Sequence, residues 1–253
     1  MSSPETPPVA TDSMSASAAA RVRSPRRTDA LSRERVVQAS IELLDAAGED
    51  GLTVRALTTH LATGRGALYH HVTGKDDLLA AATDGIIGPI VAVADAAADE
   101  EDPEQALRGL ALKIFDAIDA HPWVGMQLSR RPQPAVFRLW RRIGSLLSEL
   151  GVSGTGLSDA GSAFLGYILG TTAQYAAGAR RATDDAAREK YLAELAAHWI
   201  DDDADPLTRQ AATDLIEHDD RDQFRAGVDI FLAGIRALHR GVTTEHSSAG
   251  EDQ

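Results

Sequence analysis

The sequence predicts an all-α protein, with a three-helix N-terminal domain at residues 31–78 and a larger helical domain at residues 79–240. Two observations carry this prediction. Apolar residues recur at spacings of three and four along most of the chain, and no stretch alternates with the period of a strand. Glycine and proline then divide the helical pattern into separate segments. Residues 1–30 and 241–253 are polar, and we expect both to be disordered tails.

Composition limits the class of protein further. Hydrophobic residues make up 43% of the 253 residues, which is enough for a folded core, and no run of about 18 apolar residues predicts a membrane span. The N-terminus lacks the apolar segment of a signal peptide, so we expect a cytoplasmic protein without a membrane partner. The absence of cysteine excludes disulfides and thiol catalysis.

Two N-cap residues begin the first two helices. Ser32 can cap a helix that ends at Gly48, with Leu31 and Val36 spaced as a hydrophobic staple. Thr53 can cap a second helix, which we expect at residues 54–61. Both helices therefore begin with side chains that satisfy otherwise unpaired backbone N–H groups.

A short third helix follows a tight turn. Ala62, Thr63 and Gly64 interrupt the helical pattern, and a helix from Arg65 to His71 would then bury Leu68. Its outer side carries small, cationic and aromatic residues, which suit close approach to a major groove flanked by phosphates. Thr73 and Asp76 have the spacing of a capping box that opens a fourth helix at Lys75. The pattern predicts a helix-turn-helix that binds DNA.

A characteristic run of residues follows the turn: Leu68, Tyr69, His71 and Val72, then Lys75 four residues after the His, with Leu78 and Leu79 behind them. This segment resembles the tetracycline-repressor (TetR) family of regulators. The resemblance covers residues 31–90 well and the remainder only in general character. Thr58 and Thr63 depart from the residues usual in the family, Ala and Val, and we expect only local packing changes there.

Nine residues are candidate DNA contacts. Arg55 and Arg65 lie in the first turns of their helices, where a forked side chain can reach a guanine edge, although Arg55 can also be an ordinary surface residue. Lys75 offers a point charge to phosphate. The complete set is Thr53, Arg55, Arg65, Gly66, Ala67, Tyr69, His70, His71 and Lys75.

Charge is distributed unevenly along the chain. Residues 21–75 carry nine Lys or Arg against six Asp or Glu, whereas residues 76–253 carry sixteen against thirty. A basic N-terminal part on an acidic body suits a protein that presents one end to DNA. Arg21, Arg23, Arg26 and Arg27 precede the first helix, and they form either an arm that reaches DNA or a solvated linker.

The fourth helix begins near Lys75 and should join the two domains through a broad apolar face. Pro89 lies inside it and removes one backbone hydrogen bond, so this position is either a hinge or a passive bend. Further helices are expected at residues 104–118, 136–150, 158–181, 185–200 and 222–239, with a short one after Pro206.

Aromatic residues of the body are candidates for a small-molecule pocket or for plain core packing, and we expect three or four of eight to line a cavity. The eight are Phe115, Trp123, Met126, Phe137, Trp140, Phe164, Tyr167 and Tyr175. The resemblance implies that two C-terminal helices pair with a second copy in a four-helix bundle. The candidate dimer residues are Phe164, Ile168, Tyr175, Phe224, Val228, Phe231 and Ile235.

Enzyme motifs are missing from the sequence. We find no nucleophile elbow, phosphate-binding loop, zinc pair or catalytic carboxylate pair in the required context, and the eight histidines lack ligand spacing. We therefore expect no catalysis, metal or cofactor beyond an unidentified effector. Together with the resemblance to the TetR family, the sequence predicts a ligand-responsive repressor that binds a palindromic operator as a homodimer. An activator, a ligand-independent regulator and an all-helical small-molecule binding or scaffold protein remain the alternatives.

Overall fold

The fold is all-α, as predicted. The computed structural model describes residues 31–96, 102–130, 133–179, 185–200, 204–217 and 219–248, and these contain eleven helices and no strand. Residues 1–30, with the arginine cluster, lie outside the described residues, so their predicted disorder and DNA contact stay predictions. The described residues from Leu31 onward belong to one unit.

Four helices build the N-terminal part: α1 (Arg33–Gly51), α2 (Val54–His60), α3 (Arg65–Tyr69) and α4 (Lys75–Ala96). The predicted caps are confirmed, since Ser32 accepts a hydrogen bond from the Arg35 amide and Thr53 accepts one from the Ala56 amide. Gly48 interrupts α1 with φ of 63°, a conformation that favours glycine.

The core of this part consists of leucine and valine side chains from all four helices. Val36, Leu44, Leu57 and Leu68 are each at most 1% exposed, and α1 packs against both α2 and α4. Because Leu68 is buried, the remaining side chains of α3 point away from the core. The core therefore fixes which face of α3 meets solvent.

The cap before α4 differs from the prediction. Asp77, rather than Asp76, accepts the hydrogen bond from the Thr73 amide, at 2.9 Å, and this bond lowers the pKa of the Asp77 carboxyl. Arg33 on α1 adds an ion pair to Asp77 at 3.1 Å and a hydrogen bond to the His71 carbonyl. Asp77 thus serves both as a cap and as the anchor of α1, a role that short-range spacing does not reveal.

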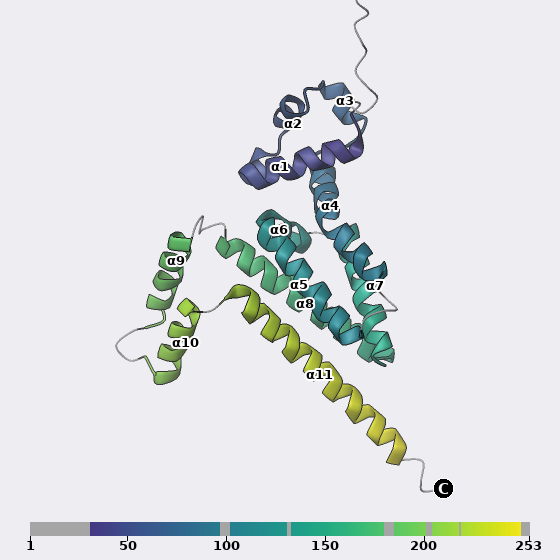
Figure 1. Ribbon diagram of the computed structural model, residues 1–253, viewed down its shortest axis with the longest axis vertical. Coiled ribbons are helices and arrows are strands. Elements are labelled where there is room, and N and C mark those ends of the chain that lie inside the picture. Colours follow the sequence, from purple (N-terminus) through teal and green to yellow (C-terminus); the bar gives the residue numbers. More distant parts are fainter. Residues whose placement is uncertain are drawn as a thin grey trace, which may run out of the picture. The chain divides into compact units, whose positions relative to one another are not determined.

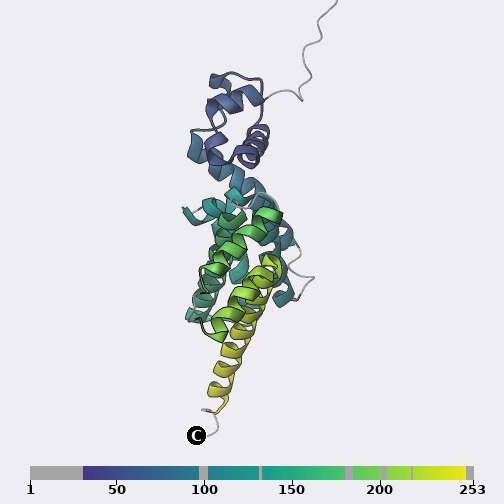
Figure 2. The same ribbon diagram turned by 90° about the vertical axis from the view of Figure 1, so that its left-hand side faces the viewer.

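Seven helices form the body: α5 (Pro103–Ala120), α6 (Pro122–Arg130), α7 (Pro134–Glu149), α8 (Gly154–Ala179), α9 (Asp185–Ala197), α10 (Pro206–Glu217) and α11 (Asp220–Ser248). The helix α8 packs against α5, α6, α7 and α11 and is the centre of the body (Figure 1). The pair α9 and α10 lie side by side (Figure 2). The helix α6 was not predicted from the sequence; it has nine residues and begins at a proline.

The helix α4 belongs to both parts, since it packs against α1 at one end and against α5 and α7 further along. The predicted boundary at residues 78 and 79 falls inside it. It continues through Pro89 as one helix. By length and composition α4 is also the one helix in the described ranges that could cross a membrane, although it packs against α1, α5, α6 and α7 and 33% of its apolar window is buried.

The C-terminal helix is longer than predicted. We expected it to end near His239, with a disordered tail from residue 241, whereas α11 continues to Ser248. Adding residues to an existing helix is much less costly than nucleating one, so a segment without an apolar stripe can extend it. Residues 249–253 lie outside the described residues.

Candidate nucleic-acid interface and effector-binding body

The turn between α2 and α3 has the geometry of a helix-turn-helix. Ala62 adopts φ of 50°, which reverses the chain directly after α2, and the Thr63 amide donates to the Thr58 carbonyl at 3.0 Å. Gly64 then begins α3 in an extended conformation. The structure brings α3 against α2 with the short connection that the sequence predicted.

Most of the predicted DNA contacts are solvent-exposed. Tyr69 is 54% exposed, His71 is half-buried, and a side chain added at Gly66 would meet no atom within 4 Å. The open surface at Gly66 allows another molecule to approach the backbone of α3. The exposed candidates are Thr53, Arg55, Arg65, Gly66, Ala67, Tyr69, His70 and Lys75.

Lys75 already has a partner inside the chain. Its Nζ donates to the Glu49 carbonyl at 2.5 Å, near the C-terminal end of α1. A cation in this place compensates backbone carbonyls that lack a helical partner. Any phosphate that binds Lys75 therefore competes with, or shares, this internal hydrogen bond.

The body contains a chain of aromatic contacts that joins α5, α8 and α11. Phe115 stacks on Phe224 at 5.0 Å and meets the edge of Tyr175 at 5.6 Å, both measured between ring centroids. Tyr167 lies 5.5 Å from Phe224 and 5.0 Å from Phe231. Three of these five residues, Phe115, Tyr167 and Tyr175, are among the aromatics expected to line a pocket or to pack in the core.

A cavity of about 10 Å³ lies at one end of this aromatic cluster. Tyr175 borders it, and its hydroxyl donates to Gln223 at 2.8 Å. Burial first, and the Asp220 charge second, raise the pKa of Tyr175 to about 12, so its hydroxyl is a donor at neutral pH. The cavity is much smaller than the several hundred Å³ of typical ligand sites. Its lining residues are Phe115, Ile118, Asp119, Thr172, Tyr175 and Ala176.

The other predicted pocket residues lie elsewhere. Trp123 is buried, but its indole Nε1 donates to Asp45 of α1 at 2.7 Å. Met126 is half-buried on α6, and Phe164 and Tyr167 contact Phe231 rather than the cavity. Of the eight predicted residues, only Phe115 and Tyr175 line this cavity.

Phe137 and Trp140 do not line this cavity. They are 66% and 44% exposed on α7. The reason is the register of α7, whose inner face carries Leu139 and also Arg142, which is only 4% exposed. Arg142 lies 3.6 Å from the Asp95 carboxylate and 3.8 Å from that of Glu149, and these ion pairs allow a charged residue to take an inward position.

Asp119 at the cavity edge gives a pH prediction. Partial desolvation at the cavity edge, followed by the charges of Asp220 and Asp116, raises the pKa of the Asp119 carboxyl above its usual value, although the residue as a whole is exposed. The folded protein then holds this proton more tightly than the unfolded chain, so ionised Asp119 lowers stability at neutral pH, and the penalty fades as pH falls toward 3.8. Asp119→Asn should raise the melting temperature at neutral pH, with a gain that shrinks on acidification.

The matched control for this experiment is Asp205→Asn. Hydrogen bonds from Thr208 and Leu207 lower the pKa of Asp205, so this variant should lose stability at neutral pH. Thermal unfolding followed by circular dichroism across the pH range compares the two. Equal shifts for both variants would contradict the assigned environment of Asp119.

An open groove of about 550 Å³ runs between α8 and α11. Ile230 and Leu238, on its rim, are 72% and 76% exposed. Phe231 and Ile235 also line the groove, as do small residues of α8, including Ala160 and Ala163. This face is apolar and has no partner within the described residues.

The predicted dimer residues are mostly on the opposite face. Phe164, Ile168, Phe224 and Val228 are each 0% exposed inside the chain, and Ile235 is 8% exposed. These four residues join α8 and α11 within one subunit, whereas two other predicted dimer residues, Phe231 and Ile235, also line the groove. Both sides of α11 carry apolar residues at helical spacing, so the sequence alone could not separate its inward side from its outward side.

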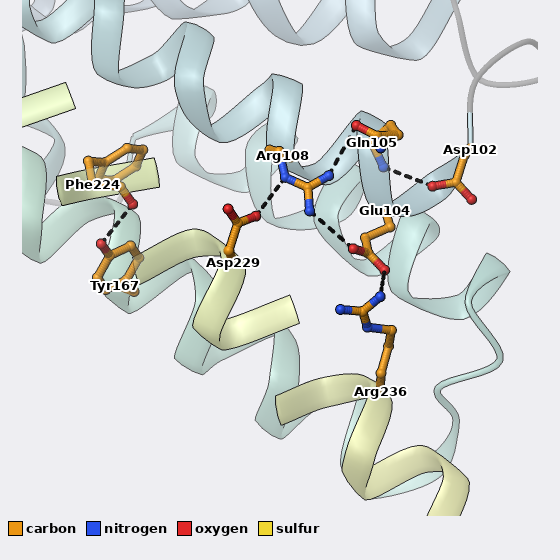
Figure 3. A network of polar contacts seen from close by, with 8 residues as sticks. All are labelled: Asp102, Glu104, Gln105, Arg108, Tyr167, Phe224, Asp229 and Arg236. Carbon is orange, nitrogen blue, oxygen red and sulfur yellow. Dashed lines mark hydrogen bonds and ion pairs between the residues drawn. The ribbon is translucent and has the colours of Figure 1, made fainter. Parts of the chain in front are cut away.

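Polar contacts fix the orientation of α11 on the body (Figure 3). Arg108 on α5 donates to Asp229 at 2.7 Å and to Glu104 at 3.1 Å, and Arg236 pairs with Glu104 at 3.0 Å. The Tyr167 hydroxyl donates to the Phe224 carbonyl at 3.0 Å. These contacts hold the aromatic side of α11 inward, so Ile230 and Leu238 remain outward.

Within the described residues no group of three or more His, Asp or Glu side chains has the arrangement of a metal site. The exposed helix-turn-helix and the helical body define a class, the DNA-binding transcriptional regulators. A family model described as "Bacterial regulatory proteins, tetR family" matches residues 36–82, and one described as "Tetracyclin repressor-like, C-terminal domain" matches residues 97–239. The chain belongs to the TetR family of transcriptional regulators, which are not enzymes.

Individual relatives agree with this assignment. The structure of SCO7222, a TetR from Streptomyces coelicolor, is 43% identical, with a TM-score of 0.70 over 83% of this chain and 99% of that one. An HTH-type transcriptional regulator of Saccharopolyspora erythraea is 30% identical over 65% of this chain and 68% of its own. The repressor DrrR1 of Streptomyces coeruleorubidus is 29% identical over 58% of this chain, and the match spans about half, 54%, of DrrR1.

Proposed function

We propose that the protein is a homodimeric repressor that binds a palindromic operator and leaves it when a small molecule binds the body. The observation that carries the DNA-binding role is the exposed face of α3, with Arg65, Tyr69 and His70 projecting from a helix whose Leu68 is buried. We infer repression rather than activation because the relative DrrR1 is named a transcriptional repressor. Such a protein acts in the cytoplasm and needs no metal or prosthetic group.

The groove between α8 and α11 supports the homodimer. A two-fold symmetric interface uses the same surface on both copies, and an apolar surface on a helix pair can form a four-helix bundle with its own copy. One α3 reads only a few base pairs, so two copies are required for a specific site. We propose the rim residues Ile230 and Leu238, together with Phe231 and Gly234, as the contact surface.

The small cavity between α5 and α8 supports an effector site. Phe115 and Tyr175 offer aromatic walls, and the Tyr175 hydroxyl offers one donor. Asp119 at its edge disfavours an anionic effector, whereas the nearby Asp116 and Asp220 are ion-paired with Arg221 and Arg188. The site must expand before it holds a ligand of ordinary size.

A ligand-independent regulator is the second candidate, and the size of this cavity favours it. Thermal-shift measurements with a panel of neutral and cationic aromatic compounds separate the two. Compounds that raise the melting temperature and also release operator DNA support the effector-responsive repressor. If every stabilising compound leaves DNA binding unchanged, the ligand-independent regulator is the better description.

A further inference from the structure

Two hydrogen-bonded residue pairs connect α6 of the body to α1 of the DNA-binding part. In the first pair, Trp123 Nε1 donates to Asp45 Oδ1 at 2.7 Å, and His121 Nδ1 lies 2.8 Å from the same oxygen. In the second pair, Gln127 Nε2 donates to Glu49 Oε1 at 2.7 Å. The paired residues are four apart on each helix, so both hydrogen bonds lie on the facing sides of α1 and α6. We call Asp45, Glu49, Trp123 and Gln127 the α1–α6 latch.

The same helix touches the cavity wall through a glycine. A Cβ placed on Gly125 would lie 3.1 Å from Ile118 Cγ2 and 3.2 Å from Ala176 Cβ, distances tighter than ordinary packing. Gly125 is buried, and both Ile118 and Ala176 line the small cavity. The helix α6 therefore lies against the cavity wall on one side and is bonded to α1 on the other.

We propose that Asp45 and Glu49 are positioning residues through which the effector site controls the DNA-binding part. This inference rests on the proposed function. A cavity of about 10 Å³ holds a ligand only after its walls move, and Ile118 and Ala176 are part of those walls. Protein interiors are close-packed and transmit such displacements, so α6 shifts and the latch carries the shift to α1.

The latch also reaches a candidate DNA contact. Glu49 receives Gln127 through its side chain and Lys75 through its backbone carbonyl. Lys75 opens α4 and is exposed toward solvent. A shift of the end of α1 therefore changes the position of Lys75 without any bend at Pro89. This route differs from the hinge in α4 that the sequence suggested.

The first test is Gly125→Ala in the full-length protein. The added methyl group occupies the space between α6 and the wall, so the variant should resemble the effector-bound state without ligand. Operator affinity should fall about tenfold, within the range of typical coupling between sites. Gly109→Ala on α5 is the matched control, because no atom lies within 4 Å of its added Cβ. A folded Gly125→Ala variant with unchanged affinity overturns the proposal.

The second test removes the latch. The double variant Asp45→Ala, Gln127→Ala should bind the operator nearly as well as the unmodified protein, and it should cancel most of the loss caused by Gly125→Ala. Glu42→Ala is the control on the same helix, since Glu42 pairs with His60 of α2 at 2.8 Å and not with α6. The proposal is overturned if Gly125→Ala lowers operator affinity by the same factor with and without the latch.

Two further measurements keep the outcomes distinct. If Gly125→Ala does not fold, Ala176→Val adds bulk on the cavity side of the same contact. It should lower operator affinity in the same way, and removal of the latch should cancel most of that loss. Hydrogen exchange should show reduced protection at residues 44–49 in Gly125→Ala, and this readout requires no DNA. If the unmodified protein binds the operator specifically but removing the latch does not restore the affinity lost in Gly125→Ala, only the latch is refuted. If the unmodified protein shows no specific DNA binding, the proposed function is refuted.

Discussion

Ile230→Glu combined with Leu238→Glu will convert the dimer to monomers and remove specific operator binding. Both side chains are more than 70% exposed in one chain and line the rim of the α8–α11 groove. In a symmetric dimer the two substitutions place four carboxylates in an apolar interface, and each buried unpaired charge costs several kcal/mol. Monomers also lack the gain from binding two half-sites together, which amounts to roughly 10²- to 10⁴-fold.

Analytical ultracentrifugation and operator titration by fluorescence anisotropy measure the two effects. Val93→Glu on α4 is the control, because Val93 is 57% exposed and lies outside the groove. Phe231→Asp is a poorer choice, since the Phe231 ring also packs on Phe164 and Tyr167 within the subunit. A doubly substituted protein that sediments as a dimer would show that another surface joins the two copies.

Arg65→Ala will cost about 1–3 kcal/mol on the cognate operator and relax the preference at one base pair in each half-site. Arg65 begins α3 with an exposed side chain, where its guanidinium can form two hydrogen bonds to a guanine edge. Arg55→Ala, at the exposed first turn of α2, should act in the same way. Competition binding with single-base operator variants measures the change in preference.

Lys75→Ala provides the contrast for these arginine variants. It should weaken binding to cognate and random DNA alike. The slope of log affinity against log salt concentration should fall by about one for each phosphate that the lysine no longer neutralises. Lys190→Ala on α9, also a highly exposed cation, should leave both quantities unchanged. Removing the bond to Glu49 also lowers stability, so unfolding is measured separately. A changed base preference in Lys75→Ala with preference retained in Arg65→Ala would place the recognition surface elsewhere.

Local features of the fold could be predicted because their partners are near in sequence. Ser32 and Thr53 cap helices within three residues, and the buried Leu68 fixes the face of α3. Asp77 was missed because it combines a local cap with an ion pair to Arg33, 44 residues away. The spacing of neighbouring residues can indicate the cap, but it cannot indicate an ion pair to a residue far away in the sequence.

The body was less predictable for a related reason. Trp123 looked like a pocket residue, but its partner Asp45 is 78 positions distant and belongs to another part of the fold. Apolar residues occur on two sides of α11, so periodicity alone could not separate the inner Phe224 from the outer Ile230. The packing of α11 against α5 and α8 determines which of its two sides is buried.

Titration of the full-length protein with DNA from upstream of its own gene tests the central claim most directly. The account predicts a protected, two-fold symmetric site that binds two subunits and is preferred over random DNA of equal length, with an affinity that falls as salt rises. Equal binding to upstream and random DNA, or a protected site without two-fold symmetry, would contradict the claim that this protein is a dimeric operator-binding regulator.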